Sequence, residues 1–355
     1  MNESGLKDIR SLSLSDLKTT FTNQGYQAFR GQQVYEWLWK KSCINFDEMT
    51  NLNAEIKNWL KENFVINAIR VEDKQISSDG TIKSGFRLHD GFLVEGVLIP
   101  ADDRMTACVS SQVGCSLTCK FCATGTLNRE RNLTPDEIYD QVVIIRNWAQ
   151  THYGKPLSNI VFMGMGEPLL NYANVLKGIE KITSPEGLGM SSDRITVSTA
   201  GIAKMITKLA DDNVKFNLAL SLHAANDIKR NLIMPINESN NLKAVGESLR
   251  YFHSKTKKRI TFEYIAFNNF NESIKDAKEL LSFCKNIPSK VNIIEYNPTG
   301  DGQFEKADSS KIDAFCAFLE KNGIIARVRR SRGKDIDAAC GQLANKKHEE
   351  ALVKE

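Results

Sequence analysis

The chain has 355 residues, of which 41% are hydrophobic and 25% are charged, and its formal net charge is +4. These values are typical of a soluble globular protein. Its first residues contain no apolar stretch of the kind that a secretion signal needs, and no apolar run is long enough to span a bilayer. We therefore expect a cytoplasmic protein without a membrane partner, built from one large domain and a small appendage.

Residues 1–65 predict a small helical domain. Leu14, Leu17 and Phe21 lie at helical spacing, and a second helix begins near Phe29. This second helix carries two tryptophans beside two lysines. The tryptophans could form the core of the domain, or the helix could belong to an accessory domain that binds RNA.

The rest of the chain predicts an α/β fold. Residues 66–104 contain short apolar stretches around a turn at 78–80, which indicates a β extension. Residues 105–345 alternate between β-rich apolar runs and helical patterns, and residues 346–355 form a C-terminal tail. Six β–α units in series predict a partial (β/α)6 barrel, in which ligands bind at the carboxyl ends of the strands. The predicted strands are 105–109, 159–163, 194–198, 215–222, 260–265 and 291–296.

Three of the eight cysteines form a CxxxCxxC pattern after the first predicted barrel strand: Cys115, Cys119 and Cys122. Thiolates suit zinc or iron–sulfur centres. A structural zinc site normally needs a fourth Cys or His, and the nearest histidines are distant in sequence. Three cysteines on a [4Fe–4S] cluster instead leave one iron free to bind S-adenosylmethionine (SAM). We prefer the cluster, and a zinc-stabilised RNA-binding protein without catalysis is the alternative. The remaining cysteines away from this region, expected to pack in the core, are Cys43, Cys284 and Cys316.

Small and polar residues at the ends of the later strands could bind the cofactor. Gly166 would let the backbone approach a ligand closely, and Glu167 could accept hydrogen bonds from the methionine ammonium group. Each such residue alone is equally well a turn or core residue, and only their shared place at one sheet edge favours a site. The other candidates are Ser198, Ser221, Leu222, His223 and Asn297.

Three segments together resemble the radical SAM adenine-C2 methyltransferases, which act on 23S ribosomal RNA and on transfer RNA. The segments are 107–115, 164–168 and 335–343. The similarity extends from about Phe29 to Gln342. A sister family methylates C8 of the same rRNA adenine and shares the cysteines and the segment 335–340. Pro168 and the segment 95–100 are more similar to the C2 enzymes, so we expect C2 methylation.

The resemblance implies a two-stage reaction, because adenine C2 is too electron-poor to attack a sulfonium methyl group directly. Cys340 is methylated by one SAM molecule. A second SAM, cleaved at the cluster, gives a radical that removes hydrogen from the S-methyl group, and the methylene radical adds to C2. Glu95 is similar to the family's proton acceptor, and Cys108 then forms a transient disulfide with Cys340 that releases the product. Judged without the resemblance, Cys108 could be a packing residue and Cys340 a small buried hydrophobe.

Two basic runs fit the RNA partner that the resemblance implies. Five basic residues and no acid lie between Arg327 and Lys334, and residues 255–259 form a second run. Each run alone could be a solvated face, whereas the two together favour a polyanion. The resemblance also implies an electron donor such as flavodoxin or ferredoxin, and we expect a monomer.

Overall fold

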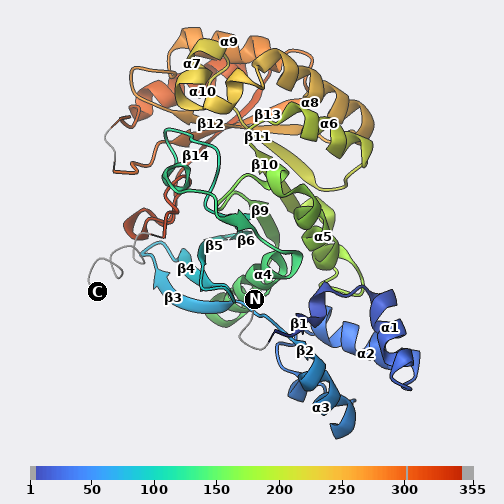
Figure 1. Cartoon of the computed structure of the whole chain (residues 1–355). Helices are drawn as coiled ribbons and strands as arrows, with labels where there is room; N and C mark the ends of the chain where they lie inside the picture. Colours follow the sequence, from blue (N-terminus) through green and yellow to red (C-terminus); the bar gives the residue numbers. More distant parts are fainter. Residues whose placement is uncertain (1–4, 301–302, 346–355) are drawn as a thin grey trace.

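The computed structural model describes residues 5–300 and 303–345, and the expected tail 346–355 lies outside them. Within this described part, the main sheet has ten strands in the order β14-β13-β12-β11-β10-β9-β6-β5-β4-β3. The strands from β14 to β6 are parallel and form an arch with helices on its outer face (Figure 1). Their bounds are β6 (Arg104–Cys108), β9 (Asn159–Phe162), β10 (Ile195–Thr199), β11 (Asn217–Ser221), β12 (Ile260–Ala266), β13 (Ser289–Glu295) and β14 (Ile325–Arg329).

Crossover helices cover the outer face of the central strands, and their inner face lines the interior of the arch (Figure 1). Every residue of β12 is buried. The longest helix begins as its sequence predicts: Thr134 caps it, Pro135 takes the first helical position, and Glu137 completes a capping box. The helices of the arch are α4 (Pro135–Tyr153), α5 (Tyr172–Thr183), α6 (Ala203–Asp211), α7 (Asp227–Ile233), α8 (Leu242–Thr256), α9 (Ile274–Cys284) and α10 (Ser309–Lys321).

The arch contains a seventh parallel strand that was not predicted from the sequence. β14 pairs with β13 and holds the start of the basic run. Ala326 is buried between the exposed Ile325 and Arg327, as in a strand, but the arginines of this segment made it resemble a solvated basic run in the sequence. Beyond β14, the Glu295 carboxylate accepts hydrogen bonds from Arg330 and from Lys334 Nζ, the latter at 2.8 Å. An acid from β13 therefore neutralises part of the run.

The β extension continues the main sheet. β3 (Arg70–Ile76), β4 (Ile82–Arg87) and β5 (Leu93–Ala101) are antiparallel neighbours, and β5 pairs with β6. Two further pairs of short strands lie outside this sheet. They are β1 (Lys7–Asp8) with β2 (Phe64–Val65), and β7 (Gln112–Val113) with β8 (Arg131–Asn132).

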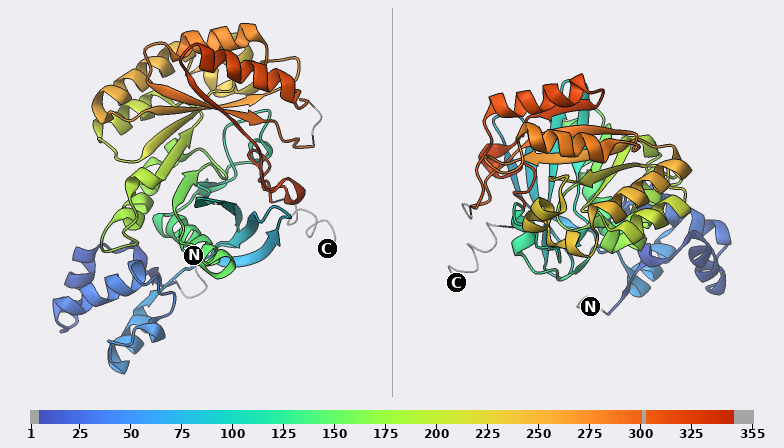
Figure 2. Two further views of the ribbon diagram at one scale, coloured as in Figure 1. Left: turned by 180° about the vertical axis from the view of Figure 1, so that it is seen from behind. Right: turned by 90° about the horizontal axis from the view of Figure 1, so that it is seen from above.

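The N-terminal helices are α1 (Leu14–Asn23), α2 (Ala28–Trp39) and α3 (Ala54–Asn63), and α2 packs against α4 and α5 (Figures 1 and 2). The two tryptophans of α2 differ in their surroundings. Trp39 is buried against Tyr139 of α4, whereas Trp37 is only partly buried and has the Lys41 ammonium 3.6 Å from its ring centroid. Trp39 therefore fills the core, and Trp37 faces a cation at the surface.

No helix in residues 5–300 and 303–345 is both long enough and apolar enough to cross a membrane.

Candidate functional site

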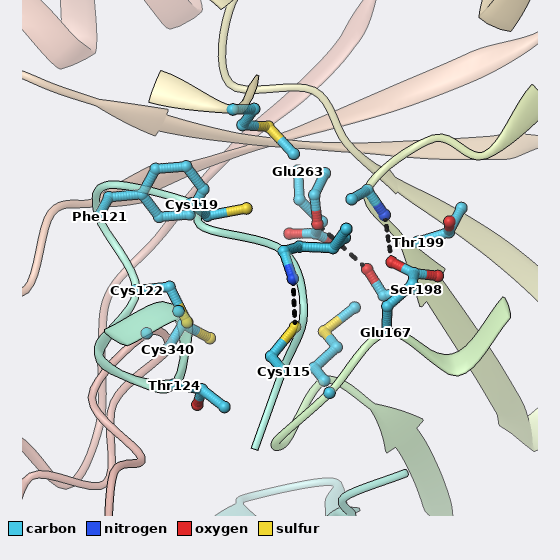
Figure 3. A pocket seen from close by; sticks show the side chains of 18 of the residues that line it. Cys115, Cys119, Phe121, Cys122, Thr124, Glu167, Ser198, Thr199, Glu263 and Cys340 are labelled. Atoms are coloured by element: carbon cyan, nitrogen blue, oxygen red, sulfur yellow. Dashed lines mark hydrogen bonds between the residues drawn. The ribbon is translucent and has the colours of Figure 1, made fainter. Parts of the chain in front are cut away.

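The three cysteines of the CxxxCxxC pattern line one cavity with about 870 Å³ of empty space (Figure 3). They lie in the loop between β7 and the short helix η3 (Ala123–Thr126), above the carboxyl ends of the parallel strands. All three are partly exposed free thiols.

The donor set fits an iron–sulfur cluster better than a single ion. No three His, Cys, Asp or Glu side chains in the described part of the chain are close enough to hold one metal ion. Sulfurs that bind separate irons of a cubane must lie farther apart than the ligands of one ion. Burial raises the pKa of the Cys115 thiol to about 11, and the charge of Cys122 adds to the effect. Three thiolates in such surroundings therefore need a cationic centre to offset their charge.

Gly166 and Glu167 follow β9 and face the same cavity. Gly166 has a φ of +94°, and a Cβ there would lie 2.5 Å from Cβ of Gln112, so the position requires glycine. Glu167 is buried, and its two carboxylate oxygens accept hydrogen bonds from the backbone N–H groups of Leu169 (3.0 Å) and Ala200 (2.7 Å). The Thr199 side chain also hydrogen-bonds this carboxylate, and the lone pair that remains can accept from a ligand ammonium group.

Ser198, Ser221 and His223 reach the cavity from the ends of β10 and β11. The two serine hydroxyls are 3.4 Å apart. His223 is buried with a φ of +53°, and its Nδ1 accepts a hydrogen bond from the backbone N–H of Ile265 (3.0 Å). Burial, together with the charge of Arg230, lowers the pKa of His223 to about 3. We therefore assign a neutral ring with its hydrogen on Nε2, which can donate to a ligand.

Arg230 of α7 is a supporting residue that sequence reasoning missed. Its side chain is fully buried and donates to the carbonyl oxygens of Ala200 (2.6 Å), Ser221 (3.2 Å) and Leu222 (3.1 Å). These bonds tie the ends of β10 and β11 beneath the cavity. No local sequence pattern distinguishes a buried arginine from an exposed one on a polar helix, so the role of Arg230 could not be predicted from the sequence.

The loop that carries Cys340 is attached to the cluster loop. Ala123 N–H donates to the Gly341 carbonyl (2.7 Å), and the Thr124 hydroxyl donates to the Leu343 carbonyl (2.6 Å). Asn297 anchors the other side, because its Nδ2 donates to the Cys340 carbonyl (3.3 Å). Figure 3 shows Cys340 beside Cys122 at the cavity wall.

Cys108, at the end of β6, lies in an adjoining cavity that Cys340 also lines. Cys108 is buried, and burial followed by the charge of Cys340 raises the pKa of its thiol to about 12. Arg329 lines this cavity as well. Both cysteines thus line one space, although Cys108 ends β6 and Cys340 lies in the segment after β14, at opposite sides of the arch.

Glu95 of β5 lines neither of these two cavities, and its carboxylate has more polar partners than the apolar sequence of the strand suggests. Its carboxylate pairs with Lys83 Nζ at 3.2 Å. It also accepts hydrogen bonds from the backbone N–H groups of Ala344 (2.8 Å) and Asn345 (3.2 Å). In this arrangement Glu95 anchors the segment that follows Cys340.

The structure gathers most of the candidate residues, although not all of them line the cluster cavity. Leu222 is fully buried in the apolar core, and Asn297 reaches the site through its bond to the Cys340 loop. Cys43, Cys284 and Cys316 pack in the core, as the sequence predicts. The predicted residues that line the cavity are Cys115, Cys119, Cys122, Gly166, Glu167, Ser198, Ser221, His223 and Cys340. Lining residues that the sequence did not suggest include Thr199, Met234 and Glu263.

Comparisons with known proteins agree with this geometry. Residues 7–66 match the family model described as the ribosomal RNA large subunit methyltransferase N-terminal domain, and residues 109–283 match the radical SAM superfamily. The chain is 64% identical to the "Probable dual-specificity RNA methyltransferase RlmN" of Cytophaga hutchinsonii, over 96% of this chain and 93% of that protein. The protein of the same name from Christiangramia forsetii is 59% identical over 96% of this chain and 97% of its own length.

A solved structure gives the same result. The crystal structure of a radical SAM methyltransferase from Sphaerobacter thermophilus superimposes with a TM-score of 0.90 at 36% identity, covering 95% of this chain and 99% of that one. Likeness in sequence and in fold therefore extends over nearly the whole chain. The chain belongs to the radical SAM family of dual-specificity RNA methyltransferases.

Proposed function

We propose that this enzyme methylates C2 of a specific adenine in 23S rRNA and in tRNA, through an S-methylcysteine on Cys340 and a transient Cys108–Cys340 disulfide. The observation that carries the proposal is the position of Cys340, whose loop is hydrogen-bonded to the cluster loop and whose side chain lines both cavities. A sulfur there can meet the methyl donor on one side and a partner thiol on the other.

The enzyme uses a [4Fe–4S] cluster and SAM. When bound, these groups supply the methyl group and, by reductive cleavage of the sulfonium, a carbon radical. We assign the cluster ligands to Cys115, Cys119 and Cys122. The residues proposed to bind SAM are Gly166, Glu167, Ser198, Ser221, Leu222, His223 and Asn297.

We assign proton removal from adenine C2 to Glu95 and product release to Cys108. The Lys83 ion pair and two backbone N–H donors orient the Glu95 carboxylate toward the Cys340 loop. Glu95 lies outside the cavity in this arrangement, so the role requires the segment after Cys340 to move from its carboxylate. Cys108 faces Cys340 and is suited to attack its sulfur.

The proposal extends to the partners and to the domains. We infer that residues 1–65 form an accessory RNA-binding domain, residues 66–104 a β extension and residues 105–345 the radical SAM core. A cytoplasmic monomer that receives electrons from a flavodoxin or ferredoxin fits these roles.

Cysteine variants test the mechanism. Cys340→Ala should retain the cluster but form no methylated adenine, because the methyl acceptor is absent. Cys108→Ala should accumulate a covalent protein–RNA adduct, because the bond between Cys340 and the product is not cleaved. Denaturing gels and mass spectrometry of nuclease-treated protein detect the adduct, and Cys284→Ala is the matched control. Free turnover by Cys108→Ala would remove the resolving role from that residue.

Metal analysis tests the cluster. Protein purified without oxygen should contain about four irons and four sulfides per chain. A colourless protein with stoichiometric zinc would exclude the radical scheme.

A further inference from the structure

A third cavity, with about 1370 Å³ of space, lies inside the arch beneath the cluster cavity. It is lined by residues of β6, β9, β10, β12, β13 and β14. Four exposed cations surround it, and no ion-pair partner in the described part of the chain lies within 4.0 Å of three of them, Arg259, Lys290 and Arg327. The fourth is Arg104.

One acid, Glu263 of β12, lines this cavity. Its side chain is only 5% exposed. Oε1 accepts a hydrogen bond from Asn292 Nδ2 at 2.8 Å. Oε2 is buried and forms an ion pair with Arg329 Nη1 at 3.8 Å, but it accepts no hydrogen bond from any described residue. A buried acceptor without a donor is costly in free energy and indicates a place where a ligand donates.

Glu263 stands where the cavities meet. It also lines the cluster cavity, where Figure 3 shows its side chain, and Arg329 also lines the cavity that holds Cys108 and Cys340. Met163 lines all three. A ligand that enters past the exposed cations and ends at Glu263 therefore lies beside the space that the two sulfurs share.

An adenosine nucleotide can supply both an anion for the exposed cations and a hydrogen-bond donor for Glu263 Oε2. Its phosphates are anionic, and the 6-amino group of adenine is a hydrogen-bond donor. Guanine and hypoxanthine instead present an acceptor oxygen at the same position. A carboxylate accepts from the amino group and repels the oxygen.

Building on the function proposed above, we propose that this cavity receives the target adenosine of the RNA, with its phosphates beside Arg259, Lys290 and Arg327 and its 6-amino group donating to Glu263 Oε2. Glu263 is then the residue that selects adenine. Arg329 supports it: burial raises the pKa of Glu263, and the charge of Arg329 opposes that effect and favours the ionised acceptor.

Glu263→Gln tests the selection. Glutamine has the same shape, can keep the bond from Asn292 to its oxygen, and turns an NH₂ group toward the base. The substrates are RNA fragments around the methylated position, made with adenosine or inosine there. Methylation of the adenosine fragment should fall about 100-fold or more, because two donors now face each other. The variant should also bind the inosine fragment more tightly than the adenosine fragment, the reverse of the wild-type order.

Three measurements on the same variant distinguish adenine selection from a role in cofactor binding or in folding. SAM affinity and S-methylation of Cys340 should match the wild-type holoenzyme, and so should the melting temperature. Loss of SAM binding would assign Glu263 to the cofactor site and overturn the proposal, as would wild-type methylation of adenosine. If the wild-type enzyme methylates no C2, the proposed function fails, and the adenosine–inosine binding order still decides the role of Glu263.

The exposed cations have a separate test. Lys290→Met with Arg327→Met should weaken RNA binding about tenfold or more and reduce the dependence of log Kd on log salt by about two units, because two phosphate contacts are lost. Lys278→Met, on the outer face of α9, is the matched control. Equal effects of the double variant and the control would contradict a phosphate-binding role for this entrance.

Discussion

His223 illustrates how burial sets the chemistry of single residues in the site. Its ring packs edge-on against Phe121 with centroids 4.6 Å apart, and its Nδ1 accepts a backbone hydrogen bond. Desolvation therefore holds the pKa at about 3 and keeps the ring neutral at physiological pH. A neutral ring with a fixed hydrogen suits a ligand contact better than proton transfer.

This pKa gives a pH prediction with a defined sign. Between about pH 6.5 and pH 3 the unfolded chain binds a proton on His223 and the folded chain does not, so stability decreases as pH falls through this window. The contribution has a slope of at most about 1.4 kcal/mol per pH unit. His223→Gln should lose that slope in urea denaturation between pH 6.5 and pH 5. NMR of the wild-type ring should show no titration from pH 5 to pH 8, and a midpoint near pH 6.5 would contradict the assignment.

A second residue-scale prediction concerns the glycine before Glu167. Gly166→Ala should cost more stability than Gly323→Ala, because both positions have positive φ but only Gly166 meets a neighbour, with Gln112 Cβ at 2.5 Å. We expect about 1 kcal/mol for Gly323→Ala and roughly 3 kcal/mol for Gly166→Ala, with weakened SAM binding only in the latter. Chemical denaturation and SAM titration measure both. Equal losses would show that the contact with Gln112 does not constrain the site.

A site residue could be predicted from the sequence where its role depends on neighbouring residues in the chain, and not where it depends on distant segments. The cysteine triplet and the Gly166-Glu167 pair are local patterns whose chemistry can be read directly. Arg230 and Glu263 are single charged residues whose roles depend on carbonyls and cavities formed by distant segments. No local pattern encodes those contacts, so only the fold reveals them.

Among the elements, the N-terminal segment is joined to α4 by a buried charge cluster. Arg10 is 7% exposed and donates to Asp140 at 2.8 Å and 2.9 Å, and its Nη2 lies 3.2 Å from Asp136 and 3.4 Å from Asp8. Burial acts to lower the pKa of Arg10, but the three carboxylates outweigh it and raise the pKa above its usual value. The Arg10 guanidinium is therefore a counter-charge that three carboxylates share at this junction.

Removing that guanidinium should destabilise the junction strongly. Arg10→Met is expected to cost about 3–5 kcal/mol, because it leaves buried carboxylates without a counter-charge. Arg10→Met with Asp140→Asn should recover part of the loss. Urea denaturation measures both, with the exposed Lys7→Met as control. A loss no larger than that of the control would show that the cluster contributes little to docking of the N-terminal helices.

β14 shows where prediction of elements failed. Ala326 is buried between the exposed Ile325 and Arg327, but Arg327 and Arg329 give the segment the composition of a solvated basic run. Pairing with β13 and the cavity inside the arch accommodate these side chains. The earlier strands were predictable because their apolar runs are nearly continuous, as β12 illustrates.

In the whole molecule, the arch brings together sulfurs that are far apart in the sequence. Cys108 ends β6 and Cys340 follows β14, the two outer parallel strands of the arch. The loop after β14 crosses back to the cluster loop through Ala123 and Thr124. This topology places the proposed methyl carrier and the proposed resolving thiol at one junction of cavities, next to the cysteines of the cluster.

Mass spectrometry of nucleosides from ribosomal and transfer RNA, taken from cells with and without the gene, decides whether the enzyme methylates C2 of adenine. We expect 2-methyladenosine in both RNA fractions of cells that carry the gene, and its loss from both when the gene is deleted or when Cys340→Ala replaces the wild-type enzyme. Formation of 8-methyladenosine without 2-methyladenosine, or unchanged 2-methyladenosine after deletion, would contradict this expectation.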